Sequence, residues 1–397
     1  MLKKLFLSAT SFCFVFVYHT KAQTTITNSQ LVGNDSPNPI TTAVPFLNIT
    51  PDARGGAMGD VGAATTPDVN ASYWNSAKLA FIDKGYGAAV SYNPWLRNLV
   101  PDMALSYLSG YMKIRKEEVI GVSLTYFDLG AIQFTDAQGK DLQKFSPNEF
   151  ALAGTYSRKL SQSMGVGVTL KYIYSSLAGS ISTSSGTEPA NAAKTVAADI
   201  GYFYTKPLSL KGTKNNFAFG ANVSNVGAKI SYSNDNQRDF IPTNLRVGSS
   251  FTHELDPYNK VILSVDLNKL MVPTPPVRDD LGKIISGKEP SDGMLSGMFG
   301  SFSDAPGGFS EEMKEITISS GLEYWYNSLF AIRAGYFNES KMKGNRKYMT
   351  IGFGLKYQVF TLDVAYLQAF QQNNPLAETL RFSLSFNFDK ATASVKE

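Results

Sequence analysis

The sequence has very few of the side chains from which catalytic and metal sites are commonly built. Its 397 residues include one cysteine, Cys13, and two histidines, His19 and His253. One cysteine cannot form an internal disulfide, and zinc sites usually need several cysteines or histidines. A serine hydrolase would need one of the two histidines as its base, yet no Gly-x-Ser-x-Gly turn is present. We therefore expect no enzyme activity, no catalytic residue, no cofactor and no metal.

The first residues have the pattern of a secretory leader. Lys3 and Lys4 precede an apolar run over residues 5–17, which is followed by Thr20-Lys21-Ala22 and then Gln23. A helix needs roughly 20 apolar residues to cross a bilayer, so this run is too short to be an anchor. We expect a signal peptide over 1–22 and a mature chain that starts at Gln23.

The mature chain would be nearly neutral. Cleavage after Ala22 removes Cys13, His19 and three lysines, leaving 34 of the 37 Lys and Arg residues against 33 Asp and Glu. Proteins that bind nucleic acid normally carry a basic face. The charge balance therefore argues against a nucleic-acid partner.

From about residue 84 the chain consists of segments of about ten residues in which apolar and polar residues alternate. The last segment shows it best: Leu380, Phe382, Leu384, Phe386 and Phe388 share one face, while Arg381, Ser383, Ser385 and Asn387 share the other. Side chains alternate between the two faces of a strand. The polar face is rich in Gly, Ser and Thr, which suits the lumen of a membrane barrel whose apolar face meets lipid.

About fourteen such segments are predicted: 84–93, 102–114, 118–128, 149–159, 164–177, 195–206, 214–225, 243–254, 259–269, 314–325, 329–338, 346–357, 359–369 and 379–389. The connections between them alternate between short turns and long loops, of which 270–313 is the largest. Bacterial outer-membrane barrels have short periplasmic turns and long external loops. The expected fold is an all-β, transmembrane antiparallel β-barrel over 84–389, in contact with outer-membrane lipid, with an N-terminal extension and hatch over 23–83 and a tail over 390–397.

Charged residues on the inward faces of neighbouring strands could pair within the lumen. The expected pairs are Lys171 with Asp199, Arg246 with Asp266, Glu323 with Arg333, and Lys356 with Asp363. The pairs could brace the wall, or they could line a path for a solute. Bracing is favoured, because the Gly-rich segment before the first strand could fill the lumen.

That Gly-rich segment resembles a known family. The stretches 50–65 (TPDARGGAMGDVGAAT) and 71–81 (ASYWNSAKLAF) are similar to the hatch of FadL-type barrels and, more narrowly, to the PorV family of the type IX secretion system of Bacteroidota. The hatch residues singled out are Arg54, Asp60 and Asn75. Asn75-Ser76-Ala77 departs from the more usual Asn-Pro-Ala.

This resemblance implies a barrel that associates with the large translocon barrel protein. It would accept cargo through a C-terminal signal domain and pass it to a cell-surface attachment complex. The alternatives are a FadL-type channel for a hydrophobic solute and, less favoured, a lipid hydrolase based on His253. A binding role requires exposed apolar anchors. The expected partner-binding residues are Met294, Leu295, Met298, Phe299 and Phe302 in the 270–313 loop, together with Trp95.

Overall fold

The computed structural model describes residues 37–389, apart from 98–99, 101, 136–140, 178–180, 184–185, 189–191, 211–212, 233–237, 291–292, 371–375 and 377. The expected leader over 1–22 and the tail over 390–397 lie outside the described residues. The chain from Asn38 onward forms one compact unit. No helix within the described ranges is both long enough and apolar enough to cross a membrane.

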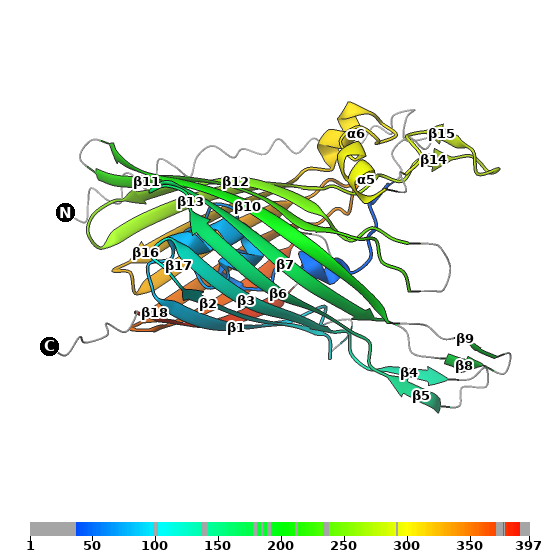
Figure 1. Ribbon diagram of the computed structural model, residues 1–397, viewed down its shortest axis with the longest axis horizontal. Helices are drawn as coiled ribbons and strands as arrows, with labels where there is room; N and C mark the ends of the chain where they lie inside the picture. The colour runs from blue at the N-terminus through cyan, green and yellow to red at the C-terminus, as the bar shows by residue number, and fades with distance from the viewer. Residues whose placement is uncertain are drawn as a thin grey trace. The chain divides into compact units, whose positions relative to one another are not determined.

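The described residues form a closed barrel of fourteen antiparallel strands (Figure 1). The strands are β1 (Tyr86–Pro94), β2 (Ala104–Lys113), β3 (Glu118–Asp128), β6 (Asn148–Lys159), β7 (Met164–Ser176), β10 (Ala193–Leu210), β11 (Thr213–Gly227), β12 (Asn244–Glu254), β13 (Asn259–Leu270), β16 (Thr317–Tyr326), β17 (Phe330–Asn338), β18 (Lys347–Tyr357), β19 (Phe360–Ala369) and β20 (Thr379–Phe388). Each barrel strand pairs with its neighbours in the chain, and β1 closes the barrel against β20, with Tyr86 opposite Phe388. The predicted fold class and number of strands are confirmed.

The two faces of the wall are those that the alternation predicts. Along β1, exposed Tyr86, Val90 and Tyr92 alternate with buried Ala89 and Ser91. An apolar face that is exposed on a single chain suits contact with lipid, whereas the inward face carries small and polar side chains.

The connections differ in size between the two ends of the barrel. The long loops with their additional short strands extend from one end of the barrel, on the right of Figure 1. These elements are the hairpins β4 (Ile132–Thr135) with β5 (Asp141–Phe145), β8 (Ile181–Thr183) with β9 (Gly186–Glu188), and β14 (Val277–Arg278) with β15 (Ile284–Ser286). By the rule for outer-membrane barrels this is the external end.

The largest loop is more structured than its irregular sequence pattern indicated. Besides β14 and β15 it contains the helices α5 (Met294–Gly300) and α6 (Phe309–Lys314). The strand expected to begin at residue 314 begins at Thr317, because α6 and Glu315, which follows it, are held in the loop by carboxylate contacts described below. We call residues 271–316 the large loop.

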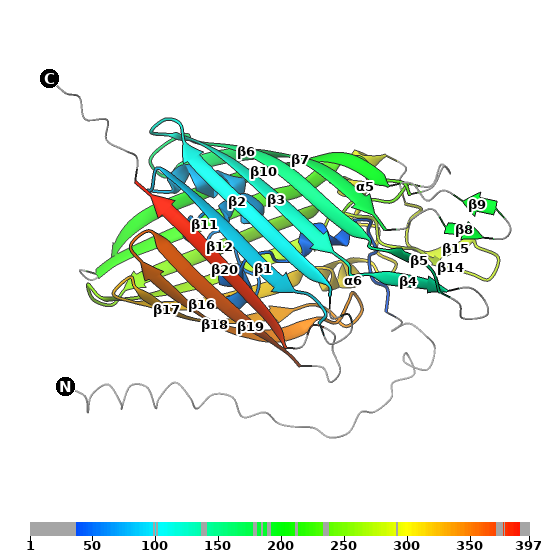
Figure 2. The ribbon, with the colours of Figure 1, turned by 90° about the horizontal axis from the view of Figure 1, so that it is seen from below.

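Residues 43–82 lie inside the barrel, where they form four short helices (Figure 2). We call this stretch the inner segment; its helices are η1 (Pro45–Asn48), α3 (Ala53–Ala57), α4 (Ala71–Trp74) and η2 (Ser76–Phe81). Glycines in the wall let its backbone approach closely. A Cβ on Gly335 would lie 2.0 Å from the backbone nitrogen of Gly59, and one on Gly220 would lie 2.0 Å from the carbonyl oxygen of Ala63.

Candidate functional site

The inner segment is held to the wall by a buried ion network centred on Glu323 of β16. Its carboxylate accepts hydrogen bonds from Arg54 Nε (3.1 Å) and Nη2 (2.8 Å), and from Arg333 Nε (2.7 Å). Arg54 also pairs with Asp68 of the inner segment at 2.8 Å, and Arg333 pairs with Asp363 of β19 at 2.7 Å. Two arginines thus share one carboxylate, and each has a second carboxylate of its own.

Two of the four expected lumen pairs are present. Glu323 and Arg333 are directly opposite each other on β16 and β17. Lys171 Nζ lies 2.7 Å from an oxygen of Asp199, beside a register shift between β10 and β11.

The expected pair of Arg246 with Asp266 is wrong. Asn268, and not Asp266, lies opposite Arg246, and it accepts a hydrogen bond from Arg246 Nε at 2.7 Å. The Arg246 guanidinium also lies over the Trp74 ring, 4.5 Å from its centroid. Asp266 accepts from the backbone nitrogens of residues 62 and 63 at 2.7 and 2.8 Å. The inner segment therefore holds Asp266, while Arg246 is held by Asn268 of the wall and by the Trp74 ring.

The pair of Lys356 with Asp363 is also wrong. Thr361 lies opposite Lys356, and Gly354 lies opposite Asp363. The Asp363 carboxylate is used by Arg333 instead. Lys356 remains exposed at the short-turn end of β18.

The other two singled-out residues of the inner segment also connect it to the wall. Asp60 pairs with Arg381 at 2.8 Å and accepts a hydrogen bond from the Tyr348 hydroxyl. The Asn75 side chain donates to the carbonyl oxygen of Tyr202 at 2.9 Å and accepts from the backbone nitrogen of Ala77, which caps η2. Whether the inner segment opens as a hatch remains a prediction.

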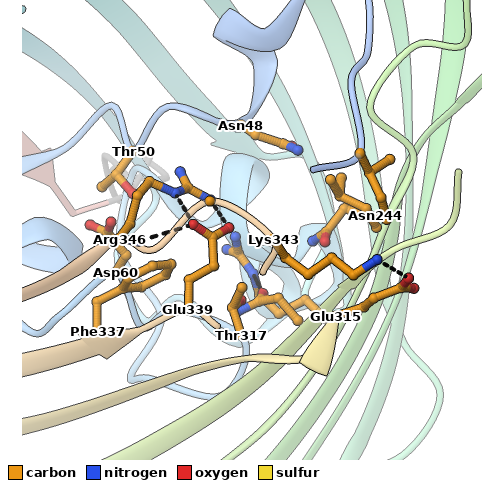
Figure 3. A pocket seen from close by; sticks show the side chains of 15 residues that line it. Asn48, Thr50, Asp60, Asn244, Glu315, Thr317, Phe337, Glu339, Lys343 and Arg346 are labelled. Carbon is orange, nitrogen blue, oxygen red and sulfur yellow. Dashed lines mark hydrogen bonds and ion pairs between the residues drawn. The ribbon is translucent and has the colours of Figure 1, made fainter. Parts of the chain in front are cut away.

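A polar cavity of about 280 Å³ is lined by the inner segment, the wall, the turn after β17 and Glu315 of the large loop (Figure 3). Asp60 and Thr50 of the inner segment line it from within. Arg346 and Glu339 line its rim and are joined by two hydrogen bonds of 2.8 Å each. Lys343 also lines it, 3.0 Å from Glu315. Because charged groups of both signs line this cavity, it does not suit a purely apolar solute.

Buried ion pairs anchor the large loop to the barrel rim. Lys269 of β13 pairs with Glu312 at 3.1 Å and with Glu315. Lys343, in the turn after β17, pairs with Glu311 at 2.5 Å and with Glu315. All five side chains are buried. Sequence reasoning missed this anchor, and the only signal was the close spacing of the acids at 311, 312 and 315.

One carboxyl group beside the anchor has an unusual environment. Asp304 Oδ2 accepts from the Thr274 backbone nitrogen at 3.3 Å, while its other oxygen has no hydrogen-bond partner. Burial, with smaller contributions from the neighbouring Glu312 and Glu315 carboxylates, raises the pKa of Asp304 to about 6. Its negative form is therefore disfavoured in the folded loop.

The apolar residues expected to bind a partner do not all lie on one surface. Leu295, Phe299 and Phe302 are 56, 65 and 44% exposed, and they form what we call the loop surface. Met298 is buried on the other side of α5, and Met294 is half-buried. Because α5 is a helix, Leu295 and Phe299, four positions apart, share one side, whereas Met298 is rotated by about 100° from its neighbour Phe299.

Trp95 does not belong to the loop surface. It packs against a buried cluster that includes Phe46, Leu105 and Ile241. His253 lies at the short-turn end of β12 and contacts the Asn215 side chain at 2.5 Å. No group of three or more His, Cys, Asp and Glu side chains in the described part of the chain could hold a metal ion.

Comparison with known proteins gives a family and a fold. The sequence model of the family described as type IX secretion system protein PorV matches residues 32–277. No curated protein matches the chain.

Similar solved structures include a monoaromatic hydrocarbon channel, CymD, with 12% identity, 86% of this chain and 98% of that chain covered, and a TM-score of 0.50. A TodX deltaS2S3 mutant hydrocarbon channel has 12% identity, coverages of 85% and 99%, and a TM-score of 0.51. A FadL homologue of Pseudomonas aeruginosa has 12% identity, coverages of 89% and 100%, and a TM-score of 0.41. Because the identity is only 12%, the likeness to the two hydrocarbon channels shows a shared fold and nothing about function.

Proposed function

Because the chain belongs to the PorV family of type IX secretion system proteins, we propose that this outer-membrane barrel receives cargo proteins at the external end of the translocon. It binds the large translocon barrel protein, accepts cargo by its C-terminal signal domain, and passes it to the cell-surface attachment complex. The barrel contributes a binding surface and performs no catalysis of its own.

The loop surface supports this proposal most directly. Leu295 and Phe299 are more than half exposed on α5, at the end of the barrel that carries the long loops. Large apolar side chains that are held out into water mark sites of protein contact. Two buried lysines and three buried glutamates fix the loop to the rim. The surface is thus presented in one position, which lowers the entropy lost on binding.

A channel for a hydrophobic solute is not favoured. The lumen is occupied by the inner segment, which ion pairs hold to the wall at Glu323 and Arg381. The cavity above it is lined by charged side chains from both the wall and the inner segment. Such a lining carries a desolvation penalty for an apolar molecule.

The test is a double substitution on the loop surface, Leu295→Asp with Phe299→Asp, in the full-length protein in its own cell. We expect the barrel to assemble normally and to keep its heat-dependent mobility on gels. Recovery of the translocon barrel protein from mild detergent should fall by about tenfold or more, since hot-spot residues contribute about 2 kcal/mol or more each. Cargo should accumulate inside the cell.

The matched control is Ile132→Asp, which places the same charge on an exposed apolar residue of another external hairpin. It should leave recovery of the translocon protein unchanged. Normal recovery and normal secretion in the double variant would contradict the docking role. Loss of the assembled barrel would show instead that α5 is a structural lid.

A further inference from the structure

A second cavity, of about 420 Å³, opens at the short-turn end of the barrel. It lies below the inner segment, on the side that the loop lengths assign to the periplasm. Basic groups reach it from the wall: Lys260 of β13, Arg333 of β17 and Lys356 of β18. Trp325 of β16 lies among them. The function proposed above assigns no role to this cavity.

Arg333 lines this cavity and carries one unused donor group. Its Nε and Nη1 are occupied by Glu323 and Asp363, but Nη2 has no hydrogen-bond partner, although the residue is only 1% exposed. A buried guanidinium nitrogen without an acceptor is rare, because its desolvation is not compensated. The Glu323 and Asp363 pairs hold the guanidinium in place, so its free edge has a fixed position.

Two lysines add positive charge to the lining, and Glu254, which lies opposite Lys260 in the sheet, is not in ion-pair contact with it. Lys260 and Lys356 form no ion pair within the described part of the chain. Lys260 Nζ lies 5.6 Å from the Trp325 ring centroid, and Arg333 Cζ lies 5.6 Å from the same ring. The Trp325 indole therefore interacts with both cations, Lys260 and Arg333, and offsets part of the repulsion between their like charges.

Most of the acidic groups around the cavity are already used. Asp68 pairs with Arg54, and Asp363 with Arg333. Lys84, at the opening, pairs with Asp389. Asp83 is the one acidic residue in the lining without an ion pair among the described residues. Asp83 is therefore the one carboxylate of the lining that is free to balance the two lysines.

We propose that this cavity binds an oxyanion, a phosphate or carboxylate group, that enters from the periplasmic side. Lys260 and Lys356 would donate hydrogen bonds to its oxygens, and the Arg333 guanidinium in the lining would add positive charge beside them. Charge-assisted hydrogen bonds of this kind are stronger than neutral ones. Trp325 and the apolar part of the inner segment leave room for an organic group attached to the oxyanion. The proposal concerns the opposite end of the barrel from the loop surface and does not depend on what that surface binds.

Titration calorimetry on the purified full-length protein in detergent at pH 7 tests the proposal, with inorganic phosphate and succinate as separate probes. We expect at least one probe to give saturable binding. Lys260→Gln with Lys356→Gln should weaken it by about tenfold or more, because two uncompensated positive charges are removed from a partly enclosed site. Neither lysine takes part in an ion pair among the described residues, so the double variant should have the same melting temperature as the unchanged barrel. Binding to phosphate alone would identify a phosphate group as the ligand, and binding to succinate would identify a carboxylate.

The matched control is Lys116→Gln with Lys206→Gln. It removes the same charge from the same end of the barrel, at lysines outside the cavity. Its affinity for the probe should stay within about twofold of the unchanged protein, since exposed charges at a distance are screened by salt. The absence of saturable binding for both probes, or equal weakening in the two double variants, would overturn the proposal.

Discussion

Arg54 and Glu323 are joined inside the barrel by two parallel hydrogen bonds, of 3.1 and 2.8 Å. Arg54 belongs to α3 of the inner segment and Glu323 to β16 of the wall, 269 residues further along the chain. Both side chains are largely or fully buried. This contact therefore connects the position of the inner segment to the integrity of the wall.

The first prediction uses the unequal roles of the two residues. Glu323→Gln leaves both Arg54 and Arg333 short of a carboxylate, whereas Arg54→Gln leaves Glu323 paired with Arg333. Breaking a buried pair costs about 3–5 kcal/mol when a charge is left uncompensated. Glu323→Gln should therefore lower the unfolding temperature of the barrel clearly more than Arg54→Gln, as measured by heat-dependent gel mobility.

An exposed pair provides the control for this prediction. Lys84→Gln breaks the pair with Asp389 at the barrel rim, where both side chains are exposed. Exposed pairs contribute about 0–1 kcal/mol, so the unfolding temperature should barely change. If Arg54→Gln were as harmful as Glu323→Gln, the sharing of one carboxylate by two arginines would be refuted.

The second prediction compares two glycines of the wall. A methyl group on Gly335 would lie 2.0 Å from the Gly59 nitrogen, whereas one on Gly154 would meet nothing within 4 Å. Gly335→Ala should displace the inner segment and cost about 1–3 kcal/mol, as overpacking does. Gly154→Ala should change the free energy of unfolding by less than about 0.5 kcal/mol. Limited proteolysis after residue 54 would detect the displacement, and equal digestion of both variants would argue against it.

The strands could be predicted because the lipid and the lumen impose opposite demands on alternate residues. In β20, Leu380 and Phe382 are exposed while Arg381 and Ser383 are buried, as the sequence pattern required. Fourteen strands and the two kinds of connection follow from the same period and from the turn residues. For these residues the alternation of apolar and polar side chains and the two environments of the wall favour the same arrangement, so the sequence pattern agrees with the structure.

Which charges pair was harder to predict, because a period of two residues fixes the face of a side chain but not its register. Any even shift between two strands leaves the faces unchanged. The sequence therefore could not show that Asn268 lies opposite Arg246. It also could not show that backbone groups of the inner segment would bind Asp266, since that contact joins residues about 200 positions apart.

The loop surface was predicted in part for a similar reason. The composition of the stretch around residue 297 showed an apolar segment in a polar loop. It did not show that α5 would bury Met298 and expose Phe299, because a helix of seven residues is too short for a clear period. The lysines that anchor the loop, Lys269 and Lys343, come from other parts of the chain.

The last prediction concerns the pH dependence of the large loop. Burial raises the pKa of Asp304 from its ordinary value of 3.8 to about 6. The folded loop thus prefers the protonated carboxyl, and this stabilisation is complete below pH 3.8 and lost as the pH rises through 6. Amide hydrogen exchange of the loop, corrected for intrinsic rates, should therefore be slower at pH 5 than at pH 7. Asp304→Asn should slow exchange at pH 7 and remove the difference between the two values.

Other charged groups around Asp304 limit the range of pH in which this test is clear. Glu312, Glu315 and Lys269 lie beside Asp304. For Glu311, burial raises the pKa, but hydrogen bonds from Lys343 and a backbone nitrogen outweigh burial and hold the pKa below its ordinary value of 4.5. The ionised Glu311 stabilises the folded loop, and this stabilisation is lost only as the pH falls below 4.5. Its pH dependence is therefore opposite to that of Asp304. Between pH 5 and 7 the effect of Asp304 should dominate. Asp280→Asn, at an exposed residue of the same loop, should leave the pH dependence intact. Faster exchange at pH 5 than at pH 7 in the unchanged protein would show that the anchoring glutamates, and not Asp304, control the order of the loop.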